Sequence, residues 1–190
     1  EAGKEKKLVE YQSGDSYIVI SGKMEMAYAG TTAKDKYITV PDTVKLTGKT
    51  CKVSAIAGKA FKNNRSVVSL KIGKNVRKIG SDAFRGCSAL KKVVFGKNVQ
   101  EIGAGAFRKC PKLTAIVLPA KVTKIGKNAF YGDKKLKSIR ILSLKVKSIG
   151  RNAFKGISPK AKIKVPKSKV RSYAKLLKKK GIGKKVKVTK

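Results

Sequence analysis

One hexapeptide pattern, Ile-Gly-x-x-Ala-Phe, recurs along the chain at nearly constant spacing. Copies begin at residues 56, 79, 102, 125 and 149, at intervals of 23, 23, 23 and 24 residues, and the copy at 56–61 is degenerate. A fixed period of this length is typical of solenoids and related arrays. One such unit cannot bury its own apolar residues, whereas stacked units align equivalent residues into continuous ladders. The pattern therefore predicts a repeat solenoid.

The remaining apolar residues keep the same frame and predict one short strand in each repeat. Two apolar residues separated by one position recur in five copies, which is the alternation of a strand with one buried face. The pairs are Leu70 and Ile72, Val93 and Phe95, Ile116 and Leu118, Ile139 and Ile141, and Ile163 and Val165. Stacking the repeats would make these strands parallel.

The segment that contains the Ala-Phe pair is expected to form a short helical turn. Glycine follows the isoleucine at positions 80, 103, 126 and 150. A glycine is needed where the backbone has a positive φ or approaches its neighbour too closely for a Cβ atom. The repeat is therefore interpreted as a short strand followed by tightly packed turns.

The two ends depart from the repeat, as terminal units must if they are to cover an apolar core. The sequence divides into an N-terminal capping segment, an atypical first repeat with a hairpin insertion, regular repeats, and a C-terminal cap; these regions are 1–35, 36–66, 67–159 and 160–190.

Both caps have elements of their own. The insertion at 44–53 is expected to be a hairpin around Gly48, and a further hairpin is expected to join 17–20 and 24–28 through Ser21-Gly22. The first ten residues are predicted to be frayed. In the C-terminal cap, 163–166 is expected to be the last strand. The apolar spacing at 170–178 predicts an amphipathic capping helix that ends at Gly181.

Charge is abundant and unevenly distributed. The chain has 48 Lys and Arg against 10 Asp and Glu, a formal net charge of +38. Residues 1–50 carry 8 basic and 7 acidic side chains, whereas 51–190 carry 40 basic and only 3 acidic ones. The longer region should therefore attract polyanions such as nucleic acid, anionic lipid, acidic glycan or wall polymer.

Composition also excludes several kinds of chemistry. The chain has no histidine, so it has no imidazole base, no histidine-activated nucleophile and no histidine metal ligand. The three cysteines, Cys51, Cys87 and Cys110, form no Cys-x-x-Cys pair and are interpreted as small buried residues. The acidic residues of 51–190 fall at different repeat positions and are interpreted as solvated surface charge; they are Asp82, Glu101 and Asp133. No enzymatic activity, metal or cofactor is expected.

The repeats resemble the BspA-type leucine-rich repeats, whose units follow Leu-x-x-Ile-x-Ile-Pro-x-x-Val-x-x-Ile-Gly-x-x-Ala-Phe-x-x-Cys-x-x-Leu. Residues 90–113 match this pattern nearly throughout: Leu-Lys-Lys-Val-Val-Phe-Gly-Lys-Asn-Val-Gln-Glu-Ile-Gly-Ala-Gly-Ala-Phe-Arg-Lys-Cys-Pro-Lys-Leu. The similarity covers roughly 36–166. The resemblance implies a right-handed, horseshoe-like solenoid in exported or surface proteins of bacteria and some protists. It also implies adhesion or the binding of host and matrix proteins, and no catalytic residues.

In horseshoe solenoids the strands line a concave surface where partners bind, so the outward strand residues are the candidate site. This surface would present two valines flanked by cations, and the candidate partner-binding residues are Lys71, Lys92, Val94, Val117, Arg140 and Lys164. An apolar centre with a charged rim suits a protein partner, whereas a uniform basic stripe would suit a polyanion.

The leading hypothesis is a non-enzymatic extracellular or cell-surface module of bacterial origin that binds proteins, anionic glycans or wall polymers. The alternative is a structural spacer domain of a larger surface protein. Nucleic-acid binding is less favoured, because the phenylalanines belong to the core and lysine far outnumbers arginine. The longest apolar run, 115–118, is too short to span a membrane. The chain begins at Glu1 without a leader, and we therefore expect a mature or trimmed fragment.

Overall fold

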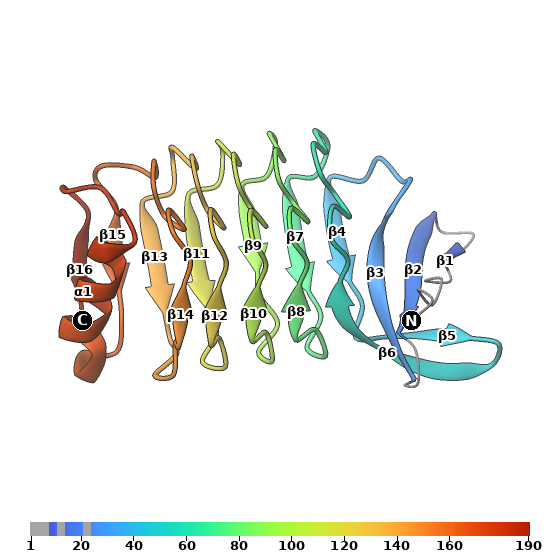
Figure 1. Ribbon diagram of the computed structural model, residues 1–190. Helices are drawn as coiled ribbons and strands as arrows, with labels where there is room; N and C mark the ends of the chain where they lie inside the picture. The colour runs from blue at the N-terminus through green and yellow to red at the C-terminus, as the bar shows by residue number, and fades with distance from the viewer. Residues whose placement is uncertain (1–7, 11–13, 21–23) are drawn as a thin grey trace, which may run out of the picture.

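The computed structural model of the protein describes residues 8–10, 14–20 and 24–190. Its repeats stack side by side into a solenoid built from two sheets (Figure 1). Buried residues from both sheets belong to one hydrophobic cluster that runs the length of the stack. The predicted repeat solenoid with short parallel strands is confirmed.

The strands predicted from the alternating apolar residues form a seven-stranded sheet. Its order is β16-β15-β13-β11-β9-β7-β4. The strands are β4 (Tyr37–Val40), β7 (Ser69–Ile72), β9 (Lys92–Val94), β11 (Ala115–Leu118), β13 (Ser138–Ile141), β15 (Lys162–Lys164) and β16 (Lys187–Thr189). All neighbours are parallel, and equivalent repeat positions face each other, as in the pairs Leu70 with Val93 and Ile116 with Ile139.

A second sheet follows the Ile-Gly pairs and the N-terminal cap. Its main path is β1-β2-β3-β6-β8-β10-β12-β14, and β5 pairs with β6. The strands are β1 (Leu8–Glu10), β2 (Asp15–Ile20), β3 (Glu25–Thr31), β5 (Thr43–Leu46), β6 (Lys49–Ile56), β8 (Lys78–Ile79), β10 (Glu101–Ile102), β12 (Lys124–Ile125) and β14 (Ser148–Ile149). The repeat strands of this sheet were not predicted, because two residues are too few to show an alternation.

The turns after each Ile-Gly pair are hydrogen-bonded, as in Ala83 N–H to Gly80 O (3.3 Å) and Arg85 N–H to Asp82 O (3.1 Å). They do not wind into a helix, because two residues in each have a positive φ, for example Asp82 (54°) and Gly86 (74°). The glycine of the pair itself has no positive φ. A Cβ atom on Gly126 would lie 2.5 Å from backbone atoms of the preceding repeat. The glycine is therefore required because the backbones of neighbouring repeats approach too closely here for a Cβ atom.

Aromatic rings form a continuous ladder through the core. Rings of neighbouring repeats stack with centroids 5.1 to 5.7 Å apart, in the order Tyr28, Phe61, Phe84, Phe107, Phe130 and Phe154. This separation is close to the spacing of hydrogen-bonded strands, about 4.8 Å. Each of the four inner rings therefore has a stacked partner on both sides.

The predicted N-terminal hairpins are present. β5 and β6 pair antiparallel around Gly48, and their hairpin projects from the N-terminal end of the stack (Figure 1). β2 and β3 also pair antiparallel, and the predicted turn between them lies outside the described residues. The prediction of fraying is wrong for residues 8–10, which form β1 against β2. The rest of that prediction concerns residues 1–7, which lie outside the described residues.

A short 3-10 helix (Lys167–Lys169) and helix α1 (Val170–Lys179) close the opposite end of the stack (Figure 1). Tyr173 and Leu177 are buried against the last repeats, and Gly181 follows the helix with a φ of 87°. β15 is not the last strand as predicted, because β16 pairs with its outer edge. No described helix is long and apolar enough to cross a membrane.

Candidate binding surface on the seven-stranded sheet

The candidate residues lie on the outward face of the seven-stranded sheet, because alternate strand residues point away from the core. The register pairs Lys71 with Val94, Val117 with Arg140, and Arg140 with Lys164. Val94 lies beside Val117, since Lys92 and Ala115, two residues earlier in these parallel strands, are partners. Five of the candidate residues therefore form one row, while Lys92 belongs to the next row, and all six side chains are exposed.

The middle of this face is a shallow apolar groove, which we call the central groove. Its volume is about 480 Å³, and its walls include Lys92, Val94, Val117, Pro119 and Leu142. The two valines are each 43% exposed and Leu142 is 42% exposed. The structure thus brings three of the predicted residues together and adds a third exposed aliphatic side chain.

Leu142 was missed as a surface residue in the sequence. It stands where other repeats have a glycine or proline, in the repeat that is one residue longer. The longer interval indicated an insertion but not where its side chain would point. In the structure, the Tyr173 hydroxyl donates to the carbonyl of the neighbouring Ser143 at 3.0 Å, so helix α1 holds this longer turn.

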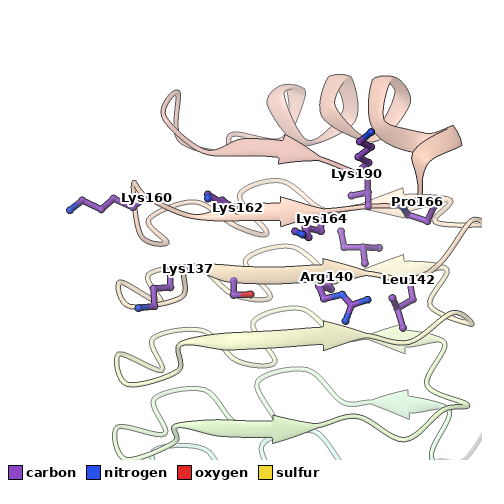
Figure 2. Close-up of a pocket in the computed structure, with 11 residues that line it drawn as sticks. Lys137, Arg140, Leu142, Lys160, Lys162, Lys164, Pro166 and Lys190 are labelled. Atoms are coloured by element: carbon purple, nitrogen blue, oxygen red, sulfur yellow. The ribbon is translucent and has the colours of Figure 1, made fainter.

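A second groove, here called the C-terminal groove, lies over β13 and β15 (Figure 2). Its volume is about 800 Å³. Six cationic side chains line it: Lys137, Arg140, Lys160, Lys162, Lys164 and Lys190. Its lining residues include no aspartate or glutamate. Arg140 and Lys164 therefore lie in a separate basic groove, although the sequence suggested only a rim around the valines.

Lys71 lies toward the N-terminal end of the face, where an acidic residue is close. Lys71 and Asp42 line a third groove, which also reaches Val94. Asp42 accepts a hydrogen bond from the Lys74 backbone N–H at 2.6 Å, and its Oδ2 lies 3.1 Å from the Lys74 Nζ atom. These two contacts lower the pKa of Asp42. The positive character of the face therefore increases toward its C-terminal end.

Two of the three carboxylates considered in the sequence make ion pairs near the surface. Asp82 lies 3.4 Å from Arg85, and Glu101 lies 4.0 Å from Lys78. Such exposed pairs contribute little to stability. Both residues fit the interpretation as surface charge.

Asp133 contradicts that interpretation, because its side chain is completely buried. It occupies the repeat position that cysteine has in the two preceding repeats, and its Oδ1 accepts a hydrogen bond from the Cys110 backbone N–H at 2.8 Å. Burial raises the pKa of Asp133 well above its usual range, and this effect outweighs the hydrogen bonds that lower it. A carboxyl group sealed in this way has no access to a substrate, so its role is structural.

Replacing Asp133 with asparagine is expected to change the pH dependence of stability. With its pKa raised, the folded protein keeps a proton that the unfolded chain loses above about pH 4, so stability falls as pH rises through this window. The slope for one such group approaches about 1.4 kcal/mol per pH unit. Urea titrations of the parent and Asp133→Asn at pH 5 and pH 7 should show that asparagine removes this fall. The control Glu101→Gln, near the surface, should keep the fall in stability between pH 5 and pH 7. If Asp133→Asn showed the same fall as the parent, the Asp133 carboxyl would not be buried.

The cysteines at the same repeat position are buried thiols that hydrogen-bond across the stack. Cys87 Sγ donates to Phe61 O at 3.2 Å, and Cys110 Sγ donates to Phe84 O at 3.3 Å. Burial raises the pKa of Cys87 to about 12, and burial also raises the pKa of Cys110. The reactive thiolate form is therefore suppressed in both. Among the described residues, no group of three or more Cys, Asp or Glu side chains could hold a metal ion.

Comparisons with known proteins agree with this architecture. A leucine-rich repeat protein of T. pallidum has 26% sequence identity and a TM-score of 0.73, over 83% of this chain and 72% of that protein. A leucine-rich cell surface protein of Faecalibacterium prausnitzii has 22% identity and a TM-score of 0.61, over 86% of this chain and 56% of that one.

The pneumococcal vaccine antigen PcpA has 19% identity and a TM-score of 0.66, over 100% of this chain and 48% of the antigen. The chain thus spans only about half the length of the last two proteins. No curated protein matches the sequence. The sequence does match the BspA-type leucine-rich repeat region in six copies over residues 54–177, and the chain therefore belongs to the BspA-type leucine-rich repeat family.

Proposed function

We propose that the chain is a non-enzymatic binding module of a bacterial extracellular or cell-surface protein. It holds a protein partner on the outward face of the seven-stranded sheet, and its cationic side chains attach anionic glycans or wall polymers. The observation that carries this proposal is the central groove, where the aliphatic side chains of Val94, Val117 and Leu142 lie exposed together.

The exposed aliphatic side chains supply a reason for a partner to bind. Burying a valine or leucine side chain fully is worth about 1.5–3 kcal/mol, so three partly exposed ones can anchor a small interface. Lys92 and Lys97 border the groove. An apolar centre with a charged margin is the usual composition of a protein-binding surface.

The backbone beneath the groove supports tight binding because it is already ordered. β9 and β11 pair with each other and with β7 and β13, so each strand beneath the valines is hydrogen-bonded on both sides. A preformed surface loses little conformational entropy when a partner docks. The family membership and the cell-surface description of the F. prausnitzii protein are consistent with this role.

The double variant Val94→Asp with Val117→Asp tests the proposal. Both side chains are exposed, so the fold should survive, while a buried charge in the interface should weaken protein binding about a hundredfold or more. The measurement is retention on a panel of immobilised extracellular-matrix proteins at physiological salt, together with thermal unfolding.

The matched control is Ser81→Asp with Ala104→Asp, which adds the same charge at exposed turn positions of adjacent repeats. This control should bind like the parent. Equal binding by the parent and by the valine double variant would refute the sheet-face site. A parent that retains no protein and no anionic polymer would instead support the spacer role.

A further inference from the structure

The C-terminal groove is a concentration of positive charge that pairs with no acidic side chain among the described residues. Within the described residues, the ion pairs are Lys74–Asp42, Arg77–Glu25, Lys78–Glu101 and Arg85–Asp82, all toward the N-terminal side of the groove. None of the six cations of the groove takes part in them. A ligand with several negative charges would therefore relieve repulsion among these side chains.

We infer that the C-terminal groove is a binding site for a sulfated polysaccharide chain. This inference rests on the proposed function, and it assigns one polymer class and one location to the attachment of anionic polymers. The central groove and its protein partner are separate from it, although Leu142 lines both grooves.

The spacing of the cations suits a polymer rather than a small anion. Arg140 and Lys164 are partners on adjacent strands, and such partners lie about 4.8 Å apart. Lys162 and Lys164 are two residues apart on β15, which corresponds to about 6.6 Å along the strand. Figure 2 shows Lys162 and Lys164 on β15 and Arg140 on the neighbouring β13, with Lys160 and Lys137 on the segments that lead into these two strands. A linear chain with repeated negative charges can contact several of these side chains together.

The apolar part of the groove favours a carbohydrate backbone. Leu142 and Pro166 lie at one end of the groove, beside the cationic residues (Figure 2), and Val165 also lines it. The carbon-bound hydrogens of sugar rings can pack against such side chains. Nucleic acid would instead require aromatic side chains on which bases stack. None of the described residues that line the groove is aromatic.

The cation types favour sulfate over the other anionic groups of polysaccharides. Five of the six groove cations are lysines and only Arg140 is an arginine. Arginine recognises carboxylate and phosphate through paired hydrogen bonds, whereas lysine acts as a mobile point charge. Sulfate esters stay ionised at all physiological pH values and bind mainly through their charge. A lysine-rich groove therefore matches them.

The experiment measures binding of a defined heparin oligosaccharide by calorimetry across a salt series. The groove variant is Arg140→Gln with Lys162→Gln and Lys164→Gln. The matched control is Lys127→Gln with Lys134→Gln and Lys155→Gln, which removes the same charge from exposed turn residues outside the grooves. We expect the groove variant to bind about tenfold more weakly or worse, with a salt slope reduced by about two to three, and the control to lose less than about threefold.

Each outcome bears on the inference. Equal losses in the two variants would mean that diffuse charge holds the polymer, which would overturn the groove site and leave general polymer attachment intact. Hyaluronate, inorganic polyphosphate and oligodeoxythymidylate are polyanions without sulfate. If any of them bound the groove as tightly as heparin does, the assignment of sulfate would be overturned. If the parent protein did not bind heparin, the groove site would be refuted. If the same preparation still retained matrix proteins, the proposed protein-binding function would be unaffected.

Discussion

Phe107→Ala is expected to lower the free energy of unfolding by about 3–5 kcal/mol. Phe107 is completely buried and stacks between Phe84 and Phe130, with ring centroids 5.1 and 5.4 Å away. Phe95 also contacts its edge at 5.6 Å. Truncation therefore leaves a cavity in the middle of the ladder and weakens the interfaces with both neighbouring repeats. Urea unfolding followed by circular dichroism measures the loss.

Phe107→Leu is the matched control, since leucine keeps much of the buried volume without the ring. It should cost less than half as much as alanine. A loss below about 1 kcal/mol for Phe107→Ala would show that the phenylalanine ladder is not the core of the solenoid.

Gly126→Ala is expected to destabilise the protein by about 3 kcal/mol, the upper part of the range for overpacked sites. The added Cβ atom would lie 2.5 Å from Ala104 N and Gly103 C. Both are backbone atoms of the preceding repeat, so a side-chain rotation cannot relieve the clash. The same urea titration measures the effect, and a separation of the two repeats should also lower the slope of the transition.

Gly183→Ala provides the comparison for this second substitution. Gly183 has no positive φ, and its added Cβ atom would meet only a side-chain atom of Val186 at 3.6 Å. Its effect should stay within about 0.5 kcal/mol. If Gly126→Ala were equally mild, the repeats would be less closely stacked than the structure shows.

The repeat architecture could be predicted from the sequence because each repeat position has a single physical role. Leu70, Val93 and Ile116 are strand residues in the same register, and all three are buried as the alternation required. The repeat strands of the second sheet could not be predicted, since two-residue strands such as Lys78–Ile79 have no periodicity. β16 was missed because Lys187–Thr189 has only one apolar residue and forms a strand only by pairing with β15.

Burial of Asp133 shows where reasoning from residue type fails. Its charge favoured a surface position, whereas its place in the repeat, shared with Cys87 and Cys110, indicated burial. Repeats stack on both sides of this position, and this packing outweighs the preference of a carboxylate for water. Burial in turn disfavours the charged form of Asp133 and raises its pKa. Position within the repeat was therefore the better predictor.

The candidate site could be predicted as a face but not as grooves. Strand alternation places Val94, Val117 and Arg140 outward, and the structure agrees. The division into a central groove and a C-terminal groove depends on side chains beyond the strand rows, including Leu142, Lys160 and Lys190. Leu142 and Lys160 lie outside the strands and Lys190 follows β16, which was not predicted, so repeat position alone could not bring them together.

The proposed protein-binding surface is the outward face of the seven-stranded sheet. A bulky label attached to one position of this face would block a partner that binds there. The native cysteines are buried, so a cysteine placed at an exposed position can be labelled selectively with a polyethylene glycol maleimide in the folded protein. The two single variants are Val117→Cys, in the central groove, and Lys127→Cys, on an exposed turn outside it.

The measurement is the affinity of each labelled variant for the immobilised matrix protein that the parent binds most tightly. The label at position 117 should weaken binding about a hundredfold or more because it covers the apolar centre, while the label at 127 should change it by less than about twofold. Undiminished binding with the label at 117, or loss of binding only with the label at 127, would mean that the partner binds another surface of the protein.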